Sequence, residues 1–523
     1  MSNSLEQVIE KYRYWIFFAI TGFVALSTWV TNPILDSNFL FHEGEYVGLL
    51  WNMHSFYRGE IQFPLLIHGA MDYIPAFIAS FLYGNDHIIV GTRVINTIIT
   101  WLCWVLFFDL CYSLISQANH RGFWLIIVTA IFLLFTPRLN AQALVVQQAF
   151  LGPRDIFVIA TVWCFTKYTV ATPLMSQRIF LITGTFSAVA ATFWSYDRGI
   201  MALAFLAVMF VGVIKDKEKL NATLLLLTAC ISLVIIQYSN IFGSLTDNVK
   251  NIIYWVINSK EVFGIGFSGI DRVSLTFTIS VVLFCTATIA IAVINWPAKA
   301  ERKNIFLIIG LILIQLLLLK TILNRPGMPR LIWAIWPSIL MMIYFTSRNI
   351  AINFRIATGW ITATPVQHRS NKPYLIVLFF FVLITNNMFQ PLWYLSFIKN
   401  TLKPKPDTEI VSTEVKSVSK IISQYPDKCI FGWVNEGVIA LMAKKRFCTQ
   451  YPYATYVSQA EEPNLLQQLK SESPNAIVFD VSGDSMMNID NRSMESRLPN
   501  VYKFIQENYP KRLQVGRYLI VSK

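Results

Sequence analysis

Two carboxylates stand one residue apart near the N-terminus, in the sequence Glu43-Gly-Glu45. A carboxylate at the edge of an apolar environment can act as a general base, because partial burial raises its pKa toward neutrality. Such a base removes the proton from a hydroxyl group as that hydroxyl attacks. Acidic residues are also ordinary in a loop outside a membrane, so the pair alone does not define a site.

Several arginines lie between apolar runs, where they could meet a negatively charged group. They are Arg58, Arg154, Arg198, Arg325 and Arg330. Asp155 and Asp197 stand directly beside two of them. A guanidinium presents paired donors that fit a phosphate or a carboxylate. We therefore expect these residues either to bind an anion or to neutralise one another near lipid.

His68 lies downstream of the acidic pair in the same polar segment. Histidine and carboxylates together could hold a divalent ion, but no His/Cys cluster with metal-ligand spacing is present. We favour a hydrogen-bonding or substrate-binding role for His68 and predict no metal site. The chain also lacks a GxGxxG or P-loop pattern, so we assign it no nucleotide.

The elements that must position these residues are apolar helices. Of the 523 residues, 55% are hydrophobic and 14% are charged, whereas a soluble domain carries about 25% charged residues. This composition excludes disorder, collagen and coiled coil, and a bilayer-spanning helix needs roughly 20 apolar residues. We predict eleven such helices, at residues 14–34, 87–116, 122–136, 154–172, 179–196, 199–214, 220–238, 273–295, 304–322, 330–347 and 373–394.

The distribution of charge predicts how these helices are oriented. With the N-terminus in the cytoplasm, cytoplasmic segments carry 15 basic and five acidic residues, and exterior segments of residues 1–399 carry 12 and 11. This asymmetry is what the positive-inside rule requires. It accounts for most of the net charge of +13, so we expect no nucleic-acid partner. Asp109 falls inside a predicted span, where it marks function, lies close to the cytoplasmic interface or pairs with a polar group on another span.

Residues 400–523 read as a second domain, after the membrane part at residues 1–399. They hold 16 basic and 13 acidic residues and follow a proline-containing linker at 401–407. Predicted strands (429–434, 447–451, 476–480 and 513–521) alternate with predicted helices (436–446, 461–472 and 497–509). The pattern indicates a small extracytoplasmic α/β domain. Cys429 and Cys448 lie at the starts of neighbouring predicted strands. The sequence leaves two alternatives open, a disulfide between them or two free thiols.

The first exterior loop contains an amphipathic segment at residues 45–57. Leu49, Leu50, Met53 and Tyr57 can share one helical face. We predict a short helix that lies in the membrane interface. Residues 239–272 read as a second exterior loop of mixed aromatic and polar character.

This layout resembles the C-type (GT-C) superfamily of polytopic membrane glycosyltransferases. The resemblance rests on the Glu43-Gly-Glu45 pair after the first span, the interfacial helix, the many spans and the exterior C-terminal domain. It departs from members that carry Asp-Asp or Asp-Glu. It implies a polyprenyl-phosphate-linked sugar donor and a glutamate base, Glu43 or Glu45. It also implies donor contacts from Arg58, His68, Arg154, Asp155, Asp197, Arg198, Arg325 and Arg330.

The resemblance implies transfer of a sugar to a lipid-linked glycan, a cell-envelope polymer or a protein on the extracytoplasmic face. The protein would be a multi-pass membrane protein with lipid, donor and acceptor as partners. No cofactor is required, although a divalent cation is possible because some members use one. A transporter or flippase remains an alternative, but it predicts repeated halves with midplane charges, and no clear repeat is visible. A glycan polymerase or ligase, or a non-catalytic scaffold, also stays open.

Overall fold

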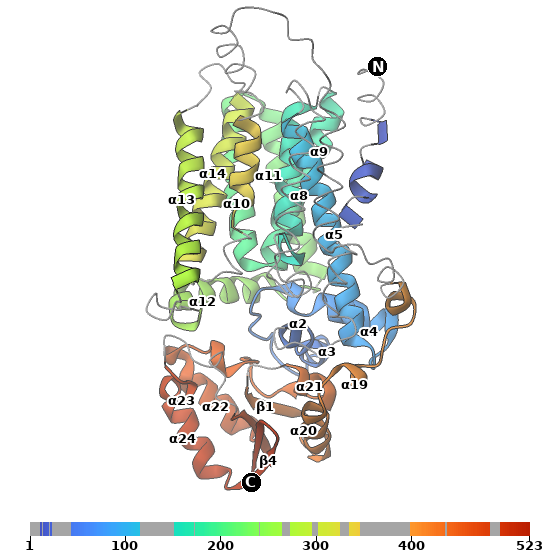
Figure 1. The fold of residues 1–523 in the computed structure, drawn as a ribbon, viewed down its shortest axis with the longest axis vertical. Coiled ribbons are helices and arrows are strands. Elements are labelled where there is room, and N and C mark those ends of the chain that lie inside the picture. The colour runs from blue at the N-terminus through green and yellow to red at the C-terminus, as the bar shows by residue number, and fades with distance from the viewer. Residues whose placement is uncertain are drawn as a thin grey trace, which may run out of the picture.

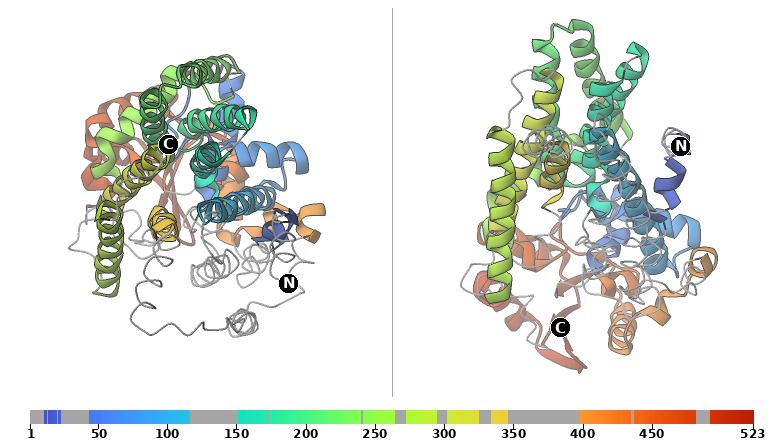
Figure 2. Two further views of the ribbon diagram at one scale, coloured as in Figure 1. Left: turned by 90° about the horizontal axis from the view of Figure 1, so that it is seen from above. Right: turned by 45° about the horizontal axis from the view of Figure 1, so that its top comes forward.

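The structure is a computed structural model with two parts, a bundle of long helices and a small α/β domain at one end of the bundle (Figure 1). In the tilted view the bundle again stands above the orange and red C-terminal domain (Figure 2). The structure describes residues 11–12, 14–19, 21–22, 43–115, 151–171, 173–239, 241–263, 272–294, 302–324, 334–345, 398–434, 437–481 and 492–523.

The long helices of the bundle coincide with predicted spans. They are α5 (Ile88–Leu114), α8 (Ile156–Val170), α9 (Leu174–Trp194), α10 (Tyr196–Lys215), α11 (Lys219–Ser239), α13 (Arg272–Ile294) and α14 (Arg302–Asn324). Five helices in the described part, within α5, α9, α10, α11 and α14, are long and apolar enough to cross a membrane. A shorter apolar helix covers Trp336–Phe345, inside the span predicted at 330–347. The spans predicted at 14–34, 122–136 and 373–394 lie wholly or largely outside the described residues, so the total of eleven stays a prediction.

Shorter helices fill the space between the bundle and the C-terminal domain (Figure 1). The amphipathic segment forms α2 (Gly44–Val47) and α3 (Leu50–Tyr57), which are separated at Gly48 and Leu49. Leu49, Leu50 and Met53 are buried, whereas Tyr57 is exposed, and α3 packs against α21 (Val438–Ala443) and β2 (Arg446–Phe447). The prediction of a helix is confirmed. Protein covers Leu49, Leu50 and Met53, and a position of this segment in the membrane interface stays a prediction.

Two more helices lie at this end of the bundle. Helix α4 (Ile74–Tyr83) packs against the start of α5. Within the predicted second exterior loop, residues 245–263 form α12 (Leu245–Phe263), which runs across the end of the bundle (Figure 1). This helix was missed because its polar and aromatic composition resembles that of a loop.

The C-terminal domain contains a five-stranded mixed sheet in the order β2-β1-β3-β5-β4. Strand β1 (Cys429–Trp433) is parallel to β2 and β3 (Ala476–Asp480), and β5 (Tyr518–Ser522) is antiparallel to β3 and β4 (Lys511–Val515). Helices α20 (Thr413–Gln424), α22 (Glu462–Glu472) and α24 (Pro499–Asn508) complete it. The α/β prediction is therefore confirmed, and Cys429 and Cys448 form a disulfide.

Two details of this domain differ from the predictions. The strand predicted at 513–521 is a hairpin, because Gly516 and Arg517 form a two-residue turn in which Gly516 has φ of +57°. Such a turn needs a left-handed residue, and glycine adopts that conformation without steric cost. The strand predicted at 447–451 is shorter and ends at Phe447.

The predicted linker attaches the two parts firmly to each other. Asp407, at the start of α19 (Asp407–Ile410), is buried and accepts hydrogen bonds from the backbone N–H groups of Ile88 and Ile89 at 3.0 and 2.9 Å. Its side chain thereby satisfies free donors at the first turn of α5. Gly48 and Gly437 also meet so closely that a Cβ on Gly48 would lie 2.6 Å from the Cα of Gly437. A domain boundary at residues 399 and 400 stays a prediction.

Candidate functional site

Glu43 is the N-cap residue of α2, at the end of the bundle that faces the C-terminal domain. Both of its carboxylate oxygens accept hydrogen bonds from the guanidinium of Arg93 on α5, at 2.5 and 2.7 Å. Both side chains are buried. A two-pronged ion pair of this kind is strong and directional, so it fixes α2 against α5.

Glu45, two residues after the ion-paired Glu43, has a different environment. Its Oε1 accepts a hydrogen bond from the phenol of Tyr456 at 2.5 Å, and Tyr456 lies in the C-terminal domain on η5 (Ala454–Tyr456). Tyr453, from the same segment, donates to the backbone oxygen of Gly44 at 3.1 Å. Burial raises the pKa of Tyr453 well above its usual value, so this phenol stays a donor. The C-terminal domain thus supplies one side of the site.

His68 forms a buried pair with Asp72, which lies on η2 (Ala70–Asp72). The Nδ1 of His68 is 2.7 Å from Oδ1 of Asp72, and the backbone N–H of His68 donates to Oδ2 at 2.8 Å. The ring of His68 stacks on Tyr46 with centroids 5.9 Å apart. Burial raises the pKa of Tyr46, the guanidinium of Arg154 opposes this rise, and the carboxylates of Asp72 and Glu45 add to it. These groups therefore share one electrostatic environment.

Gly69 allows this segment to approach the bundle closely. Its φ is +128°, and a Cβ would lie 2.7 Å from the backbone oxygens of Phe193 and Trp194. The backbone N–H of Tyr196, at the start of α10, donates to the oxygen of His68 at 2.6 Å. A glycine here is required both by its conformation and by the contact.

The two adjacent acidic–basic pairs of the sequence are connected crosswise. Arg154, on η3 (Pro153–Asp155), lies 2.7 Å from Asp197, and Arg198 lies 2.6 Å from Asp155. Arg198 also contacts Asp197 at 2.9 Å. The predicted neutralisation near lipid is thus present, and it joins the start of α8 to the start of α10. The Asp197 side chain is 30% exposed, so the network meets solvent there.

We call this set of side chains the acid–base cluster. It comprises Glu43, Glu45, Tyr46, His68, Asp72, Arg93, Arg154, Asp155, Asp197, Arg198 and Tyr456. Its five carboxylates outnumber its three arginines. An incoming anion would have to compete with these carboxylates for the arginines. The excess of carboxylates also provides groups that can accept protons.

One predicted member lies elsewhere, and two more fall outside the described residues. The Arg58 side chain is 64% exposed and pairs with Glu60 at 3.0 Å, so the structure does not bring it into the cluster. Arg325 and Arg330 lie outside the described residues. Their predicted contact with a phosphate therefore stays a prediction.

Four members of the cluster were given no role by the sequence, namely Tyr46, Asp72, Arg93 and Tyr456. Arg93 lies inside a predicted span, where a charged residue is by default a functional candidate, so a signal existed. Asp72 follows His68 by four residues, a weaker signal. Tyr456 had no local signal, because its contact with Glu45 joins positions 411 residues apart.

Asp109 belongs to a separate contact deeper in the bundle. Its Oδ2 lies 2.7 Å from the ammonium of Lys167 on α8 and accepts a hydrogen bond from the indole of Trp163 at 2.6 Å. The predicted pairing with a polar group on another helix is confirmed. Among the residues that the structure describes, no group of three His, Cys, Asp or Glu side chains is arranged to hold a metal ion.

Comparisons with known proteins support the fold. A scan of protein-family models finds no match, and a search of curated proteins finds none either. The apo oligosaccharyltransferase of Archaeoglobus fulgidus matches with a TM-score of 0.51 and 10% identity, over 96% of this chain and 73% of that chain. The same enzyme tethered to an acceptor peptide with the NVT sequon matches with a TM-score of 0.50 and 11% identity over the same shares.

A second membrane protein also matches. ArnT from Cupriavidus metallidurans, bound to undecaprenyl phosphate, aligns over 98% of both chains with 12% identity and a TM-score of 0.45. At these identities the likeness concerns the fold. The chain therefore shares the overall fold of the oligosaccharyltransferase.

Proposed function

We propose that the chain is a membrane glycosyltransferase that moves a sugar from a polyprenyl-phosphate-linked donor to an acceptor on the extracytoplasmic face. The acceptor is a lipid-linked glycan, a cell-envelope polymer or a protein. The observation that carries the proposal is the buried Glu45, held by a phenol from the C-terminal domain within the acid–base cluster. The fold similarity to an oligosaccharyltransferase supports it by analogy.

Glu45 is our candidate for the general base. Glu43 is paired with a cation, the guanidinium of Arg93, whereas Glu45 accepts a hydrogen bond from a neutral group, the phenol of Tyr456. In the proposed step, Glu45 takes the proton of the acceptor hydroxyl while the hydroxyl oxygen forms a bond to the anomeric carbon. The bond from that carbon to the phosphate oxygen breaks, and its electron pair leaves with the phosphate.

Among the residues that the structure describes, Arg154 and Arg198 are the candidates to bind the leaving phosphate. Arg325 and Arg330 remain candidates from the sequence. An arginine stabilises the charge that develops on a phosphate oxygen. The exposed edge of Asp197 is the side from which a phosphate could reach Arg154. The energy of transfer comes from the phosphate ester, so the proposal needs no nucleotide, and a divalent cation stays possible.

The proposed orientation of the chain in the membrane rests on the distribution of its charged residues. The acid–base cluster and the C-terminal domain lie at the same end of the bundle (Figure 1). The excess of basic residues in the segments assigned to the cytoplasm supports an exterior position for that end, with the N-terminus inside.

The test is transfer of radiolabelled sugar from a polyprenyl-phosphate donor in membranes. We expect Glu45→Gln to lose most of the activity, because the amide cannot accept the proton, and Glu507→Gln to keep it. Glu507 is a matched control, since it is an exposed glutamate that pairs with Lys503 and lies outside the acid–base cluster. Full activity of Glu45→Gln would eliminate the proposed base. Movement of intact substrate across vesicles without a new glycosidic bond would replace the proposal with a transporter.

A further inference from the structure

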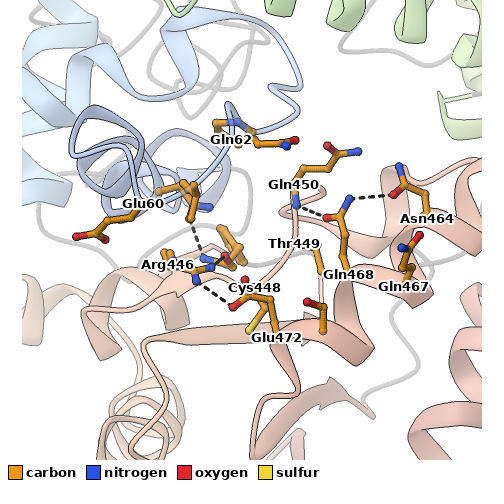
Figure 3. Close-up of a pocket in the computed structure, with 15 residues that line it drawn as sticks. Glu60, Gln62, Arg446, Cys448, Thr449, Gln450, Asn464, Gln467, Gln468 and Glu472 are labelled. Carbon is orange, nitrogen blue, oxygen red and sulfur yellow. Dashed lines mark hydrogen bonds and ion pairs between the residues drawn. The ribbon is translucent and has the colours of Figure 1, made fainter.

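A polar cleft lies between the first exterior segment and the C-terminal domain, apart from the contacts of the acid–base cluster (Figure 3). Its volume is about 450 Å³, within the range of small-molecule sites. Glu60 and Gln62 extend from one side, and Gln450, Gln467 and Gln468 from the other (Figure 3).

Side-chain amides dominate the lining of this cleft. Gln468 accepts a hydrogen bond from the backbone N–H of Gln450 at 2.8 Å and donates to Asn464 at 3.1 Å, so its orientation is fixed. Gln62 and Gln467 are exposed. An amide offers both donors and an acceptor, and a hydroxyl group is likewise donor and acceptor. The lining therefore fits a ligand that carries many hydroxyl groups.

The charges around the cleft neutralise one another. Arg446 lies 2.9 Å from Glu472, and Glu60 lies 3.0 Å from Arg58. Each acid is thus already paired with a base. This arrangement favours a neutral ligand over a phosphate or a charged peptide.

Asn52 supplies an independent observation. It is 1% exposed, lines the cleft from α3, and accepts a hydrogen bond from the backbone N–H of Phe447 at 2.8 Å. Its Nδ2 is buried without a hydrogen-bond partner among the described atoms. A buried donor without a partner is costly, and a ligand oxygen could satisfy it if the amide of Asn52 turned toward the cleft.

The cleft is joined to the acid–base cluster by a short stretch of chain. Pro64 lines the cleft, and the backbone N–H of Leu65 donates to the oxygen of Gln450 at 2.7 Å. His68 follows three residues after Leu65. A long ligand bound in the cleft would therefore be held by the same segment that supports the cluster.

We propose that this cleft binds a neutral carbohydrate. Where the proposed function holds, on which this part of the inference rests, the carbohydrate is a section of the acceptor glycan away from the reacting hydroxyl. The substrate class is then a glycan and not an unglycosylated peptide.

The test measures binding of the purified full-length chain to an array of defined oligosaccharides that also carries unglycosylated peptides. We expect the wild type to bind a subset of the saccharides. The double variant Gln62→Leu/Gln467→Leu should weaken that binding about tenfold or more, because two exposed amide partners are lost. The control Gln424→Leu/Gln514→Leu changes two exposed glutamines outside the cleft and should bind like the wild type.

Binding of no saccharide by the wild type, equal binding by the cleft variant, or preferential binding of peptides would overturn the proposal. The Glu45→Gln variant separates this proposal from the proposed function. We expect it to bind saccharide normally and to lose transfer. If it kept transfer, the base assignment would fail and the cleft would stand. If transfer required Glu45 but no saccharide bound, the cleft would fail and the function would stand.

Discussion

Buried charged residues lie at two levels along α5 and α8, and the two levels differ in their balance of charge and in their access to solvent. At the end that faces the C-terminal domain, Arg93 on α5 and Asp155 before α8 belong to the acid–base cluster. Deeper in the bundle, Asp109 on α5 pairs with Lys167 on α8. Arg93 and Asp109 lie about 24 Å apart along α5, at about 1.5 Å per residue.

The comparison shows that buried charge alone does not identify a site. The Asp109–Lys167 pair balances one acid with one base, and the indole of Trp163 adds a hydrogen bond. The cluster contains more acids than bases, draws on both parts of the chain and reaches solvent at Asp197. Surplus carboxylates with access are what general-base chemistry requires, whereas a balanced, enclosed pair is what packing in lipid requires.

The largest expected effect contrasts one acid from each level. Glu45→Gln should lower the rate of sugar transfer about 10²- to 10⁴-fold, the usual contribution of a general base. Asp109→Asn should leave the rate per folded molecule unchanged, because Asp109 lies outside the cluster. Initial rates, normalised to the folded fraction from size-exclusion chromatography, measure both. Equal losses in the two variants would remove the functional distinction between the levels.

The second effect concerns stability at the deep level. Lys167→Met should lower the free energy of unfolding by about 3–5 kcal/mol, because Asp109 would remain as a buried charge without its cation. The double variant Lys167→Met/Asp109→Leu should recover most of that loss. Thermal unfolding in detergent is the measurement, and Arg58→Ala, at an exposed pair, is a control that should change stability by about 1 kcal/mol or less. If the double variant recovered none of the lost stability, the interpretation of Asp109 and Lys167 as a balanced ion pair would be wrong.

The third effect concerns the start of α5, where Asp407 is held by backbone N–H groups. Burial raises the pKa of Asp407 to about 6, above about 3.9 in an unfolded chain. The folded state therefore binds more protons between these values, and the free energy of unfolding should fall by about 2–3 kcal/mol as the pH rises from about 4 to 6. Thermal unfolding across this range should show the slope in the wild type, and Asp407→Asn should remove most of it. An unchanged slope in the variant would assign the titration to another group.

The smallest effect tests how the C-terminal domain contributes to the cluster. Tyr456→Phe removes the phenol donor to Glu45 and should lower kcat about tenfold, or about 1.4 kcal/mol. Tyr451→Phe is a matched control, because that phenol donates to Glu461 instead. Steady-state kinetics should show the change in kcat for Tyr456→Phe alone. A change in KM alone would indicate that Tyr456 acts in substrate binding.

Sequence patterns were sufficient for the features that depend on local composition. The long helices follow from runs of apolar residues, and α5 begins and ends within two residues of its prediction. The acidic pair, His68 and the four residues Arg154, Asp155, Asp197 and Arg198 were identified because charged residues at the ends of apolar runs are conspicuous, but their crosswise pairing was not predicted. The hairpin at Gly516 could also have been found, since glycine in a two-residue gap between strands is a turn signal.

Contacts between distant parts of the chain could not be predicted in this way. The pairing of Glu43 with Arg93 depends on how α2 docks on α5, and the contact of Tyr456 with Glu45 depends on how the C-terminal domain docks on the bundle. The same docking covers Leu50 and Met53, which the pattern alone assigned to lipid. An apolar helical face does not reveal whether lipid or protein will cover it.

The contact between Tyr456 and Glu45 also has a consequence for biosynthesis. The two residues are 411 positions apart, and a ribosome adds about 5–20 residues per second, so roughly 20–80 s separate their synthesis. During that interval the early helices can enter the membrane while Glu45 still lacks its phenol. The cap that Asp407 provides for α5 arrives late in the same way. Each newly made molecule therefore completes its acid–base cluster only after Tyr456 of the C-terminal domain has been synthesised.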